Sequence, residues 1–520
     1  MLTAPRSAAG STAPASRPRA ETKTKKVVPP RSPRLFACML LAMVVALLAP
    51  SVASASSGQL SILQDDREFL GDLGEDPAAA LREAKALGVD VIRVNVIFNR
   101  IYKSPRQRTK PSGFDTSNPS SSQYAWGEVD RVVNLTRANG MKLLLTVTGP
   151  GPFWSTERPK SCRRNPCALR PNPKAFGQFA AAVARRYKGK VSLYSIYNEP
   201  NLAKTWLTPR YGKRTKQGRV ETAAAIYRKL FIAGQKAIAR YDRARRNKVL
   251  FGEVAAINRP LPFLNAALCL DTNGRPFRGR LKKLQGCSKA KRLNIGGFAI
   301  HPYNQGGNGS PRTRSKTSTS LPIAHVNRLH RLADTARRRK RINNKSVYIT
   351  EFGFQTNPPD RISKIKPRQQ AQYLNESDRL FFGDRRIKAV AQYELVDVKE
   401  TGQFNSGLRF VRRNGKGGKQ KPSYGAYRVP LVVTRRSSRS VEVWGQVRPG
   451  GRTTATIQIL SKGRFKTVKR VRTNGRGYFR TNVSRKNASR QSWRVSATYG
   501  GDEIVSRVAR AGKRLRYYSR

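Results

Sequence analysis

Short apolar runs alternate with amphipathic segments throughout residues 58–428. In the amphipathic segments hydrophobic residues recur at helical spacing, as in residues 128–140, where Gly140 supplies a usual helix stop. Continuous apolar strands that alternate with such helices are typical of an α/β protein whose parallel sheet is covered by helices. We expect eight strands, at residues 59–64, 91–98, 142–149, 191–200, 248–254, 295–303, 346–353 and 389–395. Eight strand–helix repeats predict a (β/α)8 TIM barrel.

The hydrophobic pattern changes in residues 430–520, where period-two segments such as SVEVWGQV and TATIQIL are separated by Gly and Asn turns. This pattern predicts a basic accessory domain, an antiparallel, Ig-like β-sandwich of about seven strands or fewer. Trp444, Tyr478 and Trp493 could bind carbohydrate if they were exposed, but aromatic residues of such strands more often belong to the core. We expect this domain to fold separately and to be dispensable for the chemistry of the barrel.

Residues 1–55 have the pattern of a basic leader followed by an export signal. Arg31 and Arg34 precede a 14-residue apolar run at 35–48, which is short for a membrane-spanning helix of about 20 residues. Ala53 and Ala55 then fit the small-x-small pattern of a cleavage site. We therefore predict cleavage after Ala55 and a secreted, extracellular protein. An uncleaved N-terminal membrane anchor is the alternative, because the basic leader is unusually long.

The charge of the chain is extreme. Its 520 residues include 103 Lys and Arg against 30 Asp and Glu, which gives a formal net charge of +73. Such a surface adheres to polyanions, among them acidic polysaccharide, wall polymer, lipid head groups and nucleic acid. The basic residues are spread almost evenly, and no recognised nucleic-acid-binding motif accompanies them. We therefore expect electrostatic adhesion to polyanionic surfaces without specific binding of nucleic acid. We also expect a monomer.

Cysteine usage agrees with export. Four cysteines remain after the predicted signal, namely Cys162, Cys167, Cys269 and Cys287. An even number of cysteines in an exported chain predicts disulfides, and three pairings are possible. Proximity in sequence favours Cys162–Cys167 and Cys269–Cys287. A metal site is the weaker alternative, because no Cys-x-x-Cys occurs and the three histidines lie elsewhere in the sequence.

Two of the expected barrel strands end on glutamate. The stretch YSIYNEPN, residues 194–201, runs from a buried strand directly into Asn198 and Glu199, and the seventh strand ends on Glu351. A carboxylate at the end of a buried strand is energetically unfavourable unless it is solvated, paired with a cation or hydrogen-bond donor, or required for function. Strands four and seven face each other across a barrel mouth, where chemistry takes place in this fold. Two facing carboxylates suit glycoside hydrolysis; the alternative is that each glutamate only caps a helix or pairs with an arginine.

The motifs NEP on the fourth strand and TEFG on the seventh resemble the two signatures of the clan A glycoside hydrolases, close to family 5 (cellulase family) and family 39 enzymes. The resemblance covers about residues 60–428. It implies a retaining double displacement at the β-glycosidic bonds of a polysaccharide or oligosaccharide, with Glu199 as acid/base and Glu351 as nucleophile. Such chemistry requires no metal and no cofactor.

The same resemblance implies four substrate-binding positions. Asn198 would hydrogen-bond the sugar 2-hydroxyl, Arg93 would lie near the nucleophile, and His301 and Tyr303 would line the site. The chain departs from the family pattern on strand eight, where the sequence AQYEL lacks the tryptophan that often packs beneath the cleaved sugar. Tyr393 or a loop residue would have to take the place of that tryptophan. A histidine often seen after strand three is absent as well.

Aromatic residues in two loops are further candidates for sugar contact. Trp154 follows the third strand and Trp206 the fourth, and pyranose C–H faces pack well on such rings. Trp126, at a helix start, is expected to pack internally. Two other functions compete with hydrolysis of a β-linked glycan: a catalytically weak glycan- or cell-envelope-binding protein that uses the barrel cleft and the basic surface, and a basic nucleic-acid-binding protein.

Overall fold

The structure is a computed structural model that describes residues 58–71, 76–203, 205–304, 308–399 and 404–518. The export signal expected in residues 1–55 lies outside these residues. Within the described ranges, no helix combines the length and the apolar character that crossing a bilayer requires.

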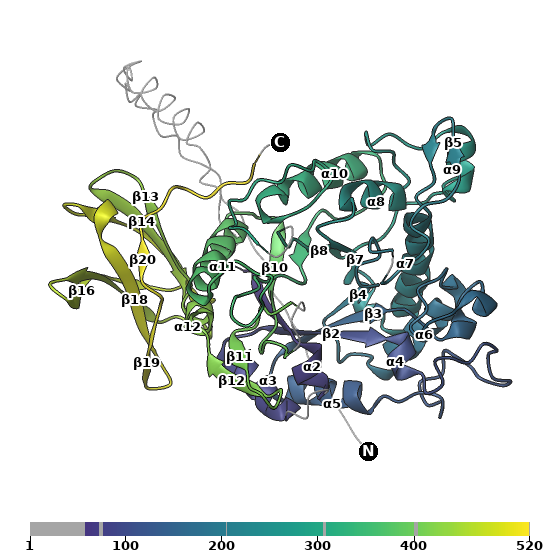
Figure 1. Ribbon diagram of the computed structural model, residues 1–520, viewed down its shortest axis with the longest axis horizontal. Coiled ribbons are helices and arrows are strands. Elements are labelled where there is room, and N and C mark those ends of the chain that lie inside the picture. Colours follow the sequence, from purple (N-terminus) through teal and green to yellow (C-terminus); the bar gives the residue numbers. More distant parts are fainter. Residues whose placement is uncertain (1–57, 72–75, 204, 305–307, 400–403, 519–520) are drawn as a thin grey trace, which may run out of the picture. The chain divides into compact units, whose positions relative to one another are not determined.

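Eight parallel strands close into a barrel, and this confirms the expected (β/α)8 fold (Figure 1). Strand β1 closes the barrel by pairing with both β10 and β2; Ile62, for example, lies opposite Ala391 on one side and Val91 on the other. In chain order the strands are β1 (Leu60–Gln64), β2 (Val91–Ile97), β3 (Lys142–Thr148), β4 (Leu193–Ile196), β7 (Val249–Ala255), β8 (Gly297–His301), β9 (Val347–Ile349) and β10 (Ile387–Tyr393).

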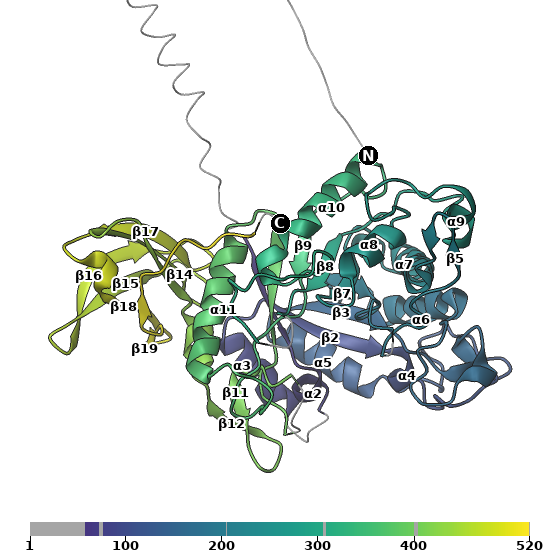
Figure 2. The ribbon, with the colours of Figure 1, turned by 45° about the horizontal axis from the view of Figure 1, so that its top comes forward.

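Amphipathic helices cover the outside of the barrel (Figure 2). Helix α6 shows why: Asn172 caps its first turn by accepting two backbone N–H groups, and Phe176, Phe179 and Val183 recur at helical spacing on its buried face. The helices are α2 (Asp66–Leu70), α3 (Pro77–Ala86), α4 (Phe98–Ile101), α5 (Gly127–Ala138), α6 (Pro173–Arg186), α7 (Thr222–Tyr241), α8 (Pro260–Ala267), α9 (Gly279–Leu284), α10 (Asn327–Arg338), α11 (Pro367–Phe382) and α12 (Pro422–Arg428). Two short antiparallel pairs lie in loops, β5 (Arg214–Thr215) with β6 (Gly218–Arg219) and β11 (Arg409–Val411) with β12 (Gly417–Gln420).

The barrel interior changes from apolar to polar along the strands. An apolar layer near their amino ends includes Val91 on β2 and Leu144 on β3. Two residues further along, the same strands carry Arg93 and Thr146, and β4 carries Ser195; all three side chains are fully buried. Because residues two apart point to the same face of a strand, these polar groups lie directly beyond the apolar layer. The carboxyl ends of the strands therefore form a polar floor for a site.

The C-terminal region folds into two antiparallel sheets, as its period-two pattern predicts. One sheet has the order β13-β14-β17, and the other has the order β16-β15-β18-β19 with β20 also paired to β18. The strands are β13 (Leu431–Arg435), β14 (Ser440–Gln446), β15 (Thr454–Ser461), β16 (Arg464–Arg472), β17 (Tyr478–Ser484), β18 (Ser492–Tyr499), β19 (Asp502–Val505) and β20 (Ala509–Arg510). The period-two segments predicted strands β14 to β18 but not β13, β19 and β20. Strands β19 and β20 are short.

Trp444, Tyr478 and Trp493 are buried, so the expectation that they belong to the core is correct. Trp493 lies in the core between the two sheets, whereas Trp444 and Tyr478 pack on Phe382 of α11 with ring centroids 5.2 and 4.7 Å away. Ion pairs accompany this aromatic contact, for example Arg379–Glu442 at 2.8 Å. The sandwich thus rests on a barrel helix, and its separate folding stays a prediction.

Both expected disulfides are present. Cys162–Cys167 closes a turn in the loop after β3, and Cys269–Cys287 closes part of the insertion between β7 and β8, with Cα atoms 5.7 and 5.6 Å apart. Trp126 is buried and stacks on Phe179, as expected for a packing residue.

Candidate active site

The chain turns sharply at the end of β4, where Glu199 leaves the strand. Tyr197 and Glu199 have φ angles of +68° and +38°, in the left-handed region that side chains with a Cβ rarely adopt. Neighbouring strands hold the turn: the N–H of Asn198 donates to Thr148 Oγ1, and the N–H of Glu199 donates to the carbonyl of Glu253, each at 2.9 Å. Backbone strain of this kind clusters at functional sites, because the surrounding structure must enforce it. The turn therefore marks Asn198 and Glu199 as candidate functional residues.

Glu351 is positioned by side chains from two other strands. Nη1 of Arg93, on β2, donates to Glu351 Oε2 at 3.1 Å, and the hydroxyl of Tyr303, which follows β8, donates to Oε1 at 3.0 Å. Both oxygens of the carboxylate thus accept a hydrogen bond, one of them from a cation. These donors orient Glu351 and stabilise its negative charge.

Glu199 and Glu351 lie close together. One carboxylate oxygen of each, together with a ring nitrogen of His301, are all within 4.8 Å of one another. The side chains of Glu199 and Glu351 are 15% and 13% exposed, so both remain accessible from solvent. The two carboxylates are therefore close enough for one small ligand to contact both.

A third glutamate, Glu253, was missed by the sequence analysis. It lies on β7 at a register irregularity between Gly252 and Val254, has a φ of +46°, and is completely buried. Its Oε2 accepts from Arg93 at 3.0 Å and from Thr350 Oγ1 at 2.9 Å. The available signal was the sequence KVLFGEV itself, because a charged residue beside glycine in an otherwise apolar strand needs a partner.

Arg93 connects most of the site. Its guanidinium is fully buried, and it donates to the side chains of Gln64, Thr146, Asn198, Glu253 and Glu351. The rigid fork of donors in a guanidinium suits such multiple contacts. We refer to Arg93, Asn198, Glu199, Glu253, His301, Tyr303 and Glu351 as the glutamate cluster. It brings together all the expected site residues except the two tryptophans and the disulfide cysteines.

His301 bridges two of the glutamates. Its Nδ1 lies 3.0 Å from Glu199 Oε1 and its Nε2 lies 2.6 Å from Glu253 Oε2. Burial lowers the pKa of His301, but the charge of Glu351 and the hydrogen bonds to Glu199 and Glu253 outweigh it and raise that pKa to about 9. The imidazole is therefore protonated at neutral pH and donates one N–H to each carboxylate.

The environments of Glu253 and Glu199 drive their pKa values apart. For Glu253, burial raises the pKa, but Arg93 and His301 outweigh burial and lower it to about 2. For Glu199, burial is the largest influence and raises the pKa; the hydrogen bond from His301 lowers it, and the charge of Glu351 raises it, so that it ends above its usual range. Glu253 is thus a fixed anion, whereas Glu199 is suited to hold a proton.

Phe404 places an exposed aromatic ring beside the glutamate cluster. Its side chain is 44% exposed, and its ring centroid lies 5.1 Å from that of Tyr303 and 6.5 Å from that of Tyr393. The sequence analysis named Tyr393 or a loop residue as the replacement for a strand-eight tryptophan. Phe404, in the loop after β10, is such a residue, but no local pattern singled it out.

Trp154 and Trp206 are not part of the glutamate cluster. Both are partly buried against the barrel core. Trp154 packs edge-on against Phe98 and Phe114, with centroids 5.8 and 5.9 Å away. In the part of the chain that the structure describes, neither tryptophan makes a hydrogen bond or ring contact with a cluster residue. Their role as sugar platforms stays a prediction.

The donor set Glu199, His301 and Glu351 contains groups that can ligate a metal ion. Both ring nitrogens of His301 already contact carboxylate oxygens, and a metal ion at Nδ1 would have to replace the contact with Glu199.

No protein-family model matches the chain, and no curated protein matches it by sequence. A search of solved structures finds a glucosidase from Croceicoccus marinus, 11% identical, with a TM-score of 0.44 and coverage of 84% of this chain and 92% of that one. It also finds virulence factor SghA from Agrobacterium tumefaciens, 15% identical, TM-score 0.41, covering 74% and 97%. A GH10 endoxylanase from a sugarcane soil metagenome is 15% identical, with a TM-score of 0.40 and coverage of 71% and 96%. Because these TM-scores lie below 0.5, the function of this chain has to be inferred from its own site.

Proposed function

We propose that this protein is a retaining glycoside hydrolase that cleaves β-glycosidic bonds of a polysaccharide or oligosaccharide. One observation carries the proposal: Glu199 and Glu351, from the ends of β4 and β9, bring carboxylate oxygens within 4.8 Å of each other in contrasting environments. Glu199 is the acid/base and Glu351 the nucleophile. The resemblance of the NEP and TEFG motifs to clan A glycoside hydrolases supports the same assignment.

In the first step Glu351 attacks the anomeric carbon of the sugar. The bond from that carbon to the leaving oxygen breaks, and Glu199 transfers its proton to this oxygen, so an alcohol departs and a glycosyl ester forms on Glu351. Arg93 and Tyr303 orient the attacking carboxylate. Arg93 also donates to Asn198 Oδ1 at 2.9 Å, which fixes the amide and leaves its N–H donors for the sugar 2-hydroxyl.

In the second step a water molecule attacks the same carbon, passes a proton to Glu199 and releases the Glu351 carboxylate. Once it is esterified, Glu351 carries no charge. Since that charge had raised the pKa of Glu199, the pKa falls at the moment when Glu199 must act as a base. The Coulomb interaction between the two glutamates thus supports both half-reactions.

The exposed ring of Phe404 provides a hydrophobic platform for a pyranose bound at the cluster. Sugar C–H faces pack on aromatic rings, and Phe404 adjoins Tyr303, the donor to Glu351. A sugar that contacts Phe404 is therefore held beside the nucleophile.

We also propose that the protein is secreted after cleavage at Ala55, with membrane anchoring as the alternative. The two disulfides support an oxidising destination. Intact mass of the mature protein tests this directly: a chain that begins at Ser56 is expected, and retention of residues 35–48 contradicts it.

A second role, adhesion to polyanionic surfaces, is favoured by strand β16. This strand lies at the edge of its sheet, and within nine residues it carries five exposed cations, namely Arg464, Lys466, Lys469, Arg470 and Arg472. Such a row attracts polyanions without requiring a particular sequence or sugar. Adhesion of this kind would keep the enzyme near an anionic wall or matrix, and it is compatible with hydrolysis.

The test of the main proposal is hydrolysis of a panel of aryl β-glycosides and polysaccharides, with Glu351→Gln as the inactive reference. Proton NMR of the first sugar released should show the β-anomer. Initial release of the α-anomer would indicate inversion, and the absence of turnover above Glu351→Gln on every substrate would reject the enzyme in favour of a binding protein.

A further inference from the structure

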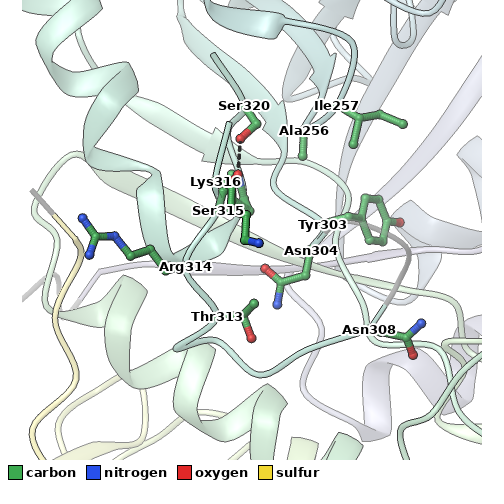
Figure 3. Close-up of a pocket in the computed structure, with 11 residues that line it drawn as sticks. Ala256, Ile257, Tyr303, Asn304, Asn308, Thr313, Arg314, Ser315, Lys316 and Ser320 are labelled. Atoms are coloured by element: carbon green, nitrogen blue, oxygen red, sulfur yellow. Dashed lines mark hydrogen bonds between the residues drawn. The ribbon is translucent and has the colours of Figure 1, made fainter. Parts of the chain in front are cut away.

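We propose that a pocket beside Tyr303 binds a negatively charged substituent of the glycan, a carboxylate or a sulfate; this inference rests on the proposed glycosidase function. The pocket has a volume of about 170 Å³ and is lined by the segments that follow β7 and β8 (Figure 3). Tyr303 lines it and also donates to Glu351 at 3.0 Å. A group in this pocket would therefore belong to the glycan held at the glutamate cluster.

The charge of the pocket wall is positive. Lys316 and Arg314 are exposed lining residues, and none of the lining residues is acidic. Lys316 extends toward Tyr303 and Asn304, whereas Arg314 points away from the pocket, with its guanidinium carbon 5.6 Å from the ring centroid of Tyr518 (Figure 3). Within the described ranges Lys316 makes no hydrogen bond or ion pair. Lys316 is therefore available to bind an anion directly, and Arg314 adds to the local field.

Asn304 supplies a second, independent indication of a ligand. It is 6% exposed, and its Nδ2 donates to the carbonyls of Gly309 and Ser310 at 3.0 and 2.9 Å, which fixes the orientation of the amide. Its Oδ1 is buried and accepts no hydrogen bond from the described residues. A buried acceptor is unfavourable unless a donor reaches it, and a sugar hydroxyl is such a donor. Hydroxyls together with one anionic group are the polar features of an acidic sugar.

The loop that carries Lys316 is fixed by buried side chains. Nε2 of His325 accepts the N–H of Ser315 at 3.1 Å, and Nη1 of Arg328 donates to the carbonyls of Thr317 and Ser320 at 2.8 and 3.1 Å. Burial and the neighbouring arginines lower the pKa of His325 to about 4, so its ring stays neutral and can accept this bond. The loop is thus preorganised, which reduces the entropy lost when the anion binds.

The segment after β20 is hydrogen-bonded to the loop that carries Lys316. The hydroxyl of Tyr518 donates to the carbonyl of Arg312 at 2.8 Å, and Nη2 of Arg312 donates to the carbonyl of Lys513 at 3.0 Å. The backbone of Tyr518 is itself tied to Ala324 and Asn327. Residues 513–518 therefore help to place the cationic wall of the pocket.

The experiment measures binding by calorimetry to the inactive Glu351→Gln protein, so that affinity is separated from turnover. The probes are two matched pairs: a hexuronate oligosaccharide with its carboxyl-reduced form, and a sulfated oligosaccharide with its desulfated form. Lys316→Gln is compared with Lys236→Gln, which removes the same charge from the exposed face of α7. Both residues are exposed, so neither change should disturb folding.

We expect at least one anionic probe to bind about tenfold more tightly than its neutral partner, and Lys316→Gln to abolish that preference while leaving the neutral affinity unchanged. Lys236→Gln should leave both affinities unchanged. The pair with the larger preference identifies the group as carboxylate or sulfate. Absence of a preference in both pairs, or equal effects of the two lysine variants, overturns the inference. If the protein hydrolyses neutral glycosides but shows no preference for anionic probes, the anion-binding pocket is rejected and the glycosidase proposal stands. If anionic probes bind in a Lys316-dependent manner but no glycan is hydrolysed, the glycosidase proposal is rejected and the anion-binding pocket stands.

Discussion

His301 and Glu253 are joined by a 2.6 Å contact between the imidazole Nε2 and the carboxylate Oε2, and neither side chain is exposed. Glu253 also accepts from Arg93, so one buried carboxylate holds both cations of the glutamate cluster. In the proposed mechanism Arg93 orients the nucleophile and His301 contacts the acid. In that mechanism Glu253 is a positioning residue for Glu351 and Glu199, because it acts on them through Arg93 and His301.

Glu253→Gln should destabilise the protein strongly. The substitution leaves Arg93 and His301 buried beside an uncharged amide, and breaking a buried ion pair typically costs about 3–5 kcal/mol of unfolding free energy. Denaturant unfolding measures this loss, and kcat should fall as well because both reacting groups lose their orientation. Glu128→Gln is the control, since the Glu128–Arg100 pair lies at the surface and should contribute less than about 1 kcal/mol. Equal stability of the two variants would contradict the role of Glu253.

His301 and His325 should titrate at well-separated pH values. NMR of the imidazole nitrogens should place the pKa of His301 near 9 and that of His325 near 4, for the reasons of charge and burial given above. Because the folded-state pKa of His301 is raised, its contribution to stability is present below about pH 6.5 and is lost as the pH rises through about 9. The shift from 6.5 to about 9 corresponds to roughly 3 kcal/mol. A neutral His301 ring at pH 7 would refute the charged bridge between Glu199 and Glu253.

Removing each of the two carboxylates that we propose to be catalytic should have different consequences. Glu351→Ala should abolish turnover on every substrate, because no glycosyl ester can form. Glu199→Ala should still react with a dinitrophenyl glycoside, whose leaving group needs no proton, and should then accumulate the ester for lack of a base. A burst followed by slow turnover that azide accelerates is the expected signature in stopped-flow kinetics. If Glu199→Ala matches the wild type on a poor leaving group, Glu199 is not the acid.

Phe404→Ala should raise KM more than it lowers kcat. The ring is proposed to hold a sugar and takes no part in proton transfer, so the loss should be about 1 kcal/mol, or roughly fivefold in KM. Tyr499→Ala is a matched control, because Tyr499 is also 44% exposed but lies on β18 of the sandwich. Unchanged KM in Phe404→Ala would show that the sugar binds elsewhere.

Adhesion through β16 should weaken with salt and with loss of its cations. The double variant Lys466→Gln/Arg470→Gln should elute from a heparin column at lower salt than the wild type. Lys229→Gln/Lys236→Gln removes the same charge from α7 and should shift elution less. Identical shifts would mean that total charge, and not the edge strand, governs adhesion.

The barrel and the positions of Glu199 and Glu351 at its strand ends were predictable because their signals are local. The strands are rich in apolar residues, and Glu199 and Glu351 stand where two of these strands end. Glu253 was missed because its inward position depends on a register irregularity with β8, which no pattern within β7 encodes. Phe404 was missed for a related reason: loop residues carry no periodicity, and its place beside Tyr303 depends on how the segment after β10 folds back.

Trp154 and Trp206 were named because they follow barrel strands, and their contact with a sugar stays a prediction. Both rings are partly buried against the barrel core, where a large ring gains from packing. The sandwich strands were recognised where alternation was regular, and missed where a strand such as β20 has two residues.

The hydrogen bond from Tyr518 to Arg312 in the Lys316 loop determines when, during synthesis, this loop can be completed. Arg312 and Tyr518 are 206 residues apart, so the loop gains this partner only after the entire sandwich has emerged from the ribosome. The strands of the barrel, in contrast, have been translated by residue 393. A nascent chain can thus bring Glu199 and Glu351 together before residues 513–518 are available, and we expect a chain stalled before residue 513 to hold both glutamates while its Lys316 loop lacks the contacts with Lys513 and Tyr518.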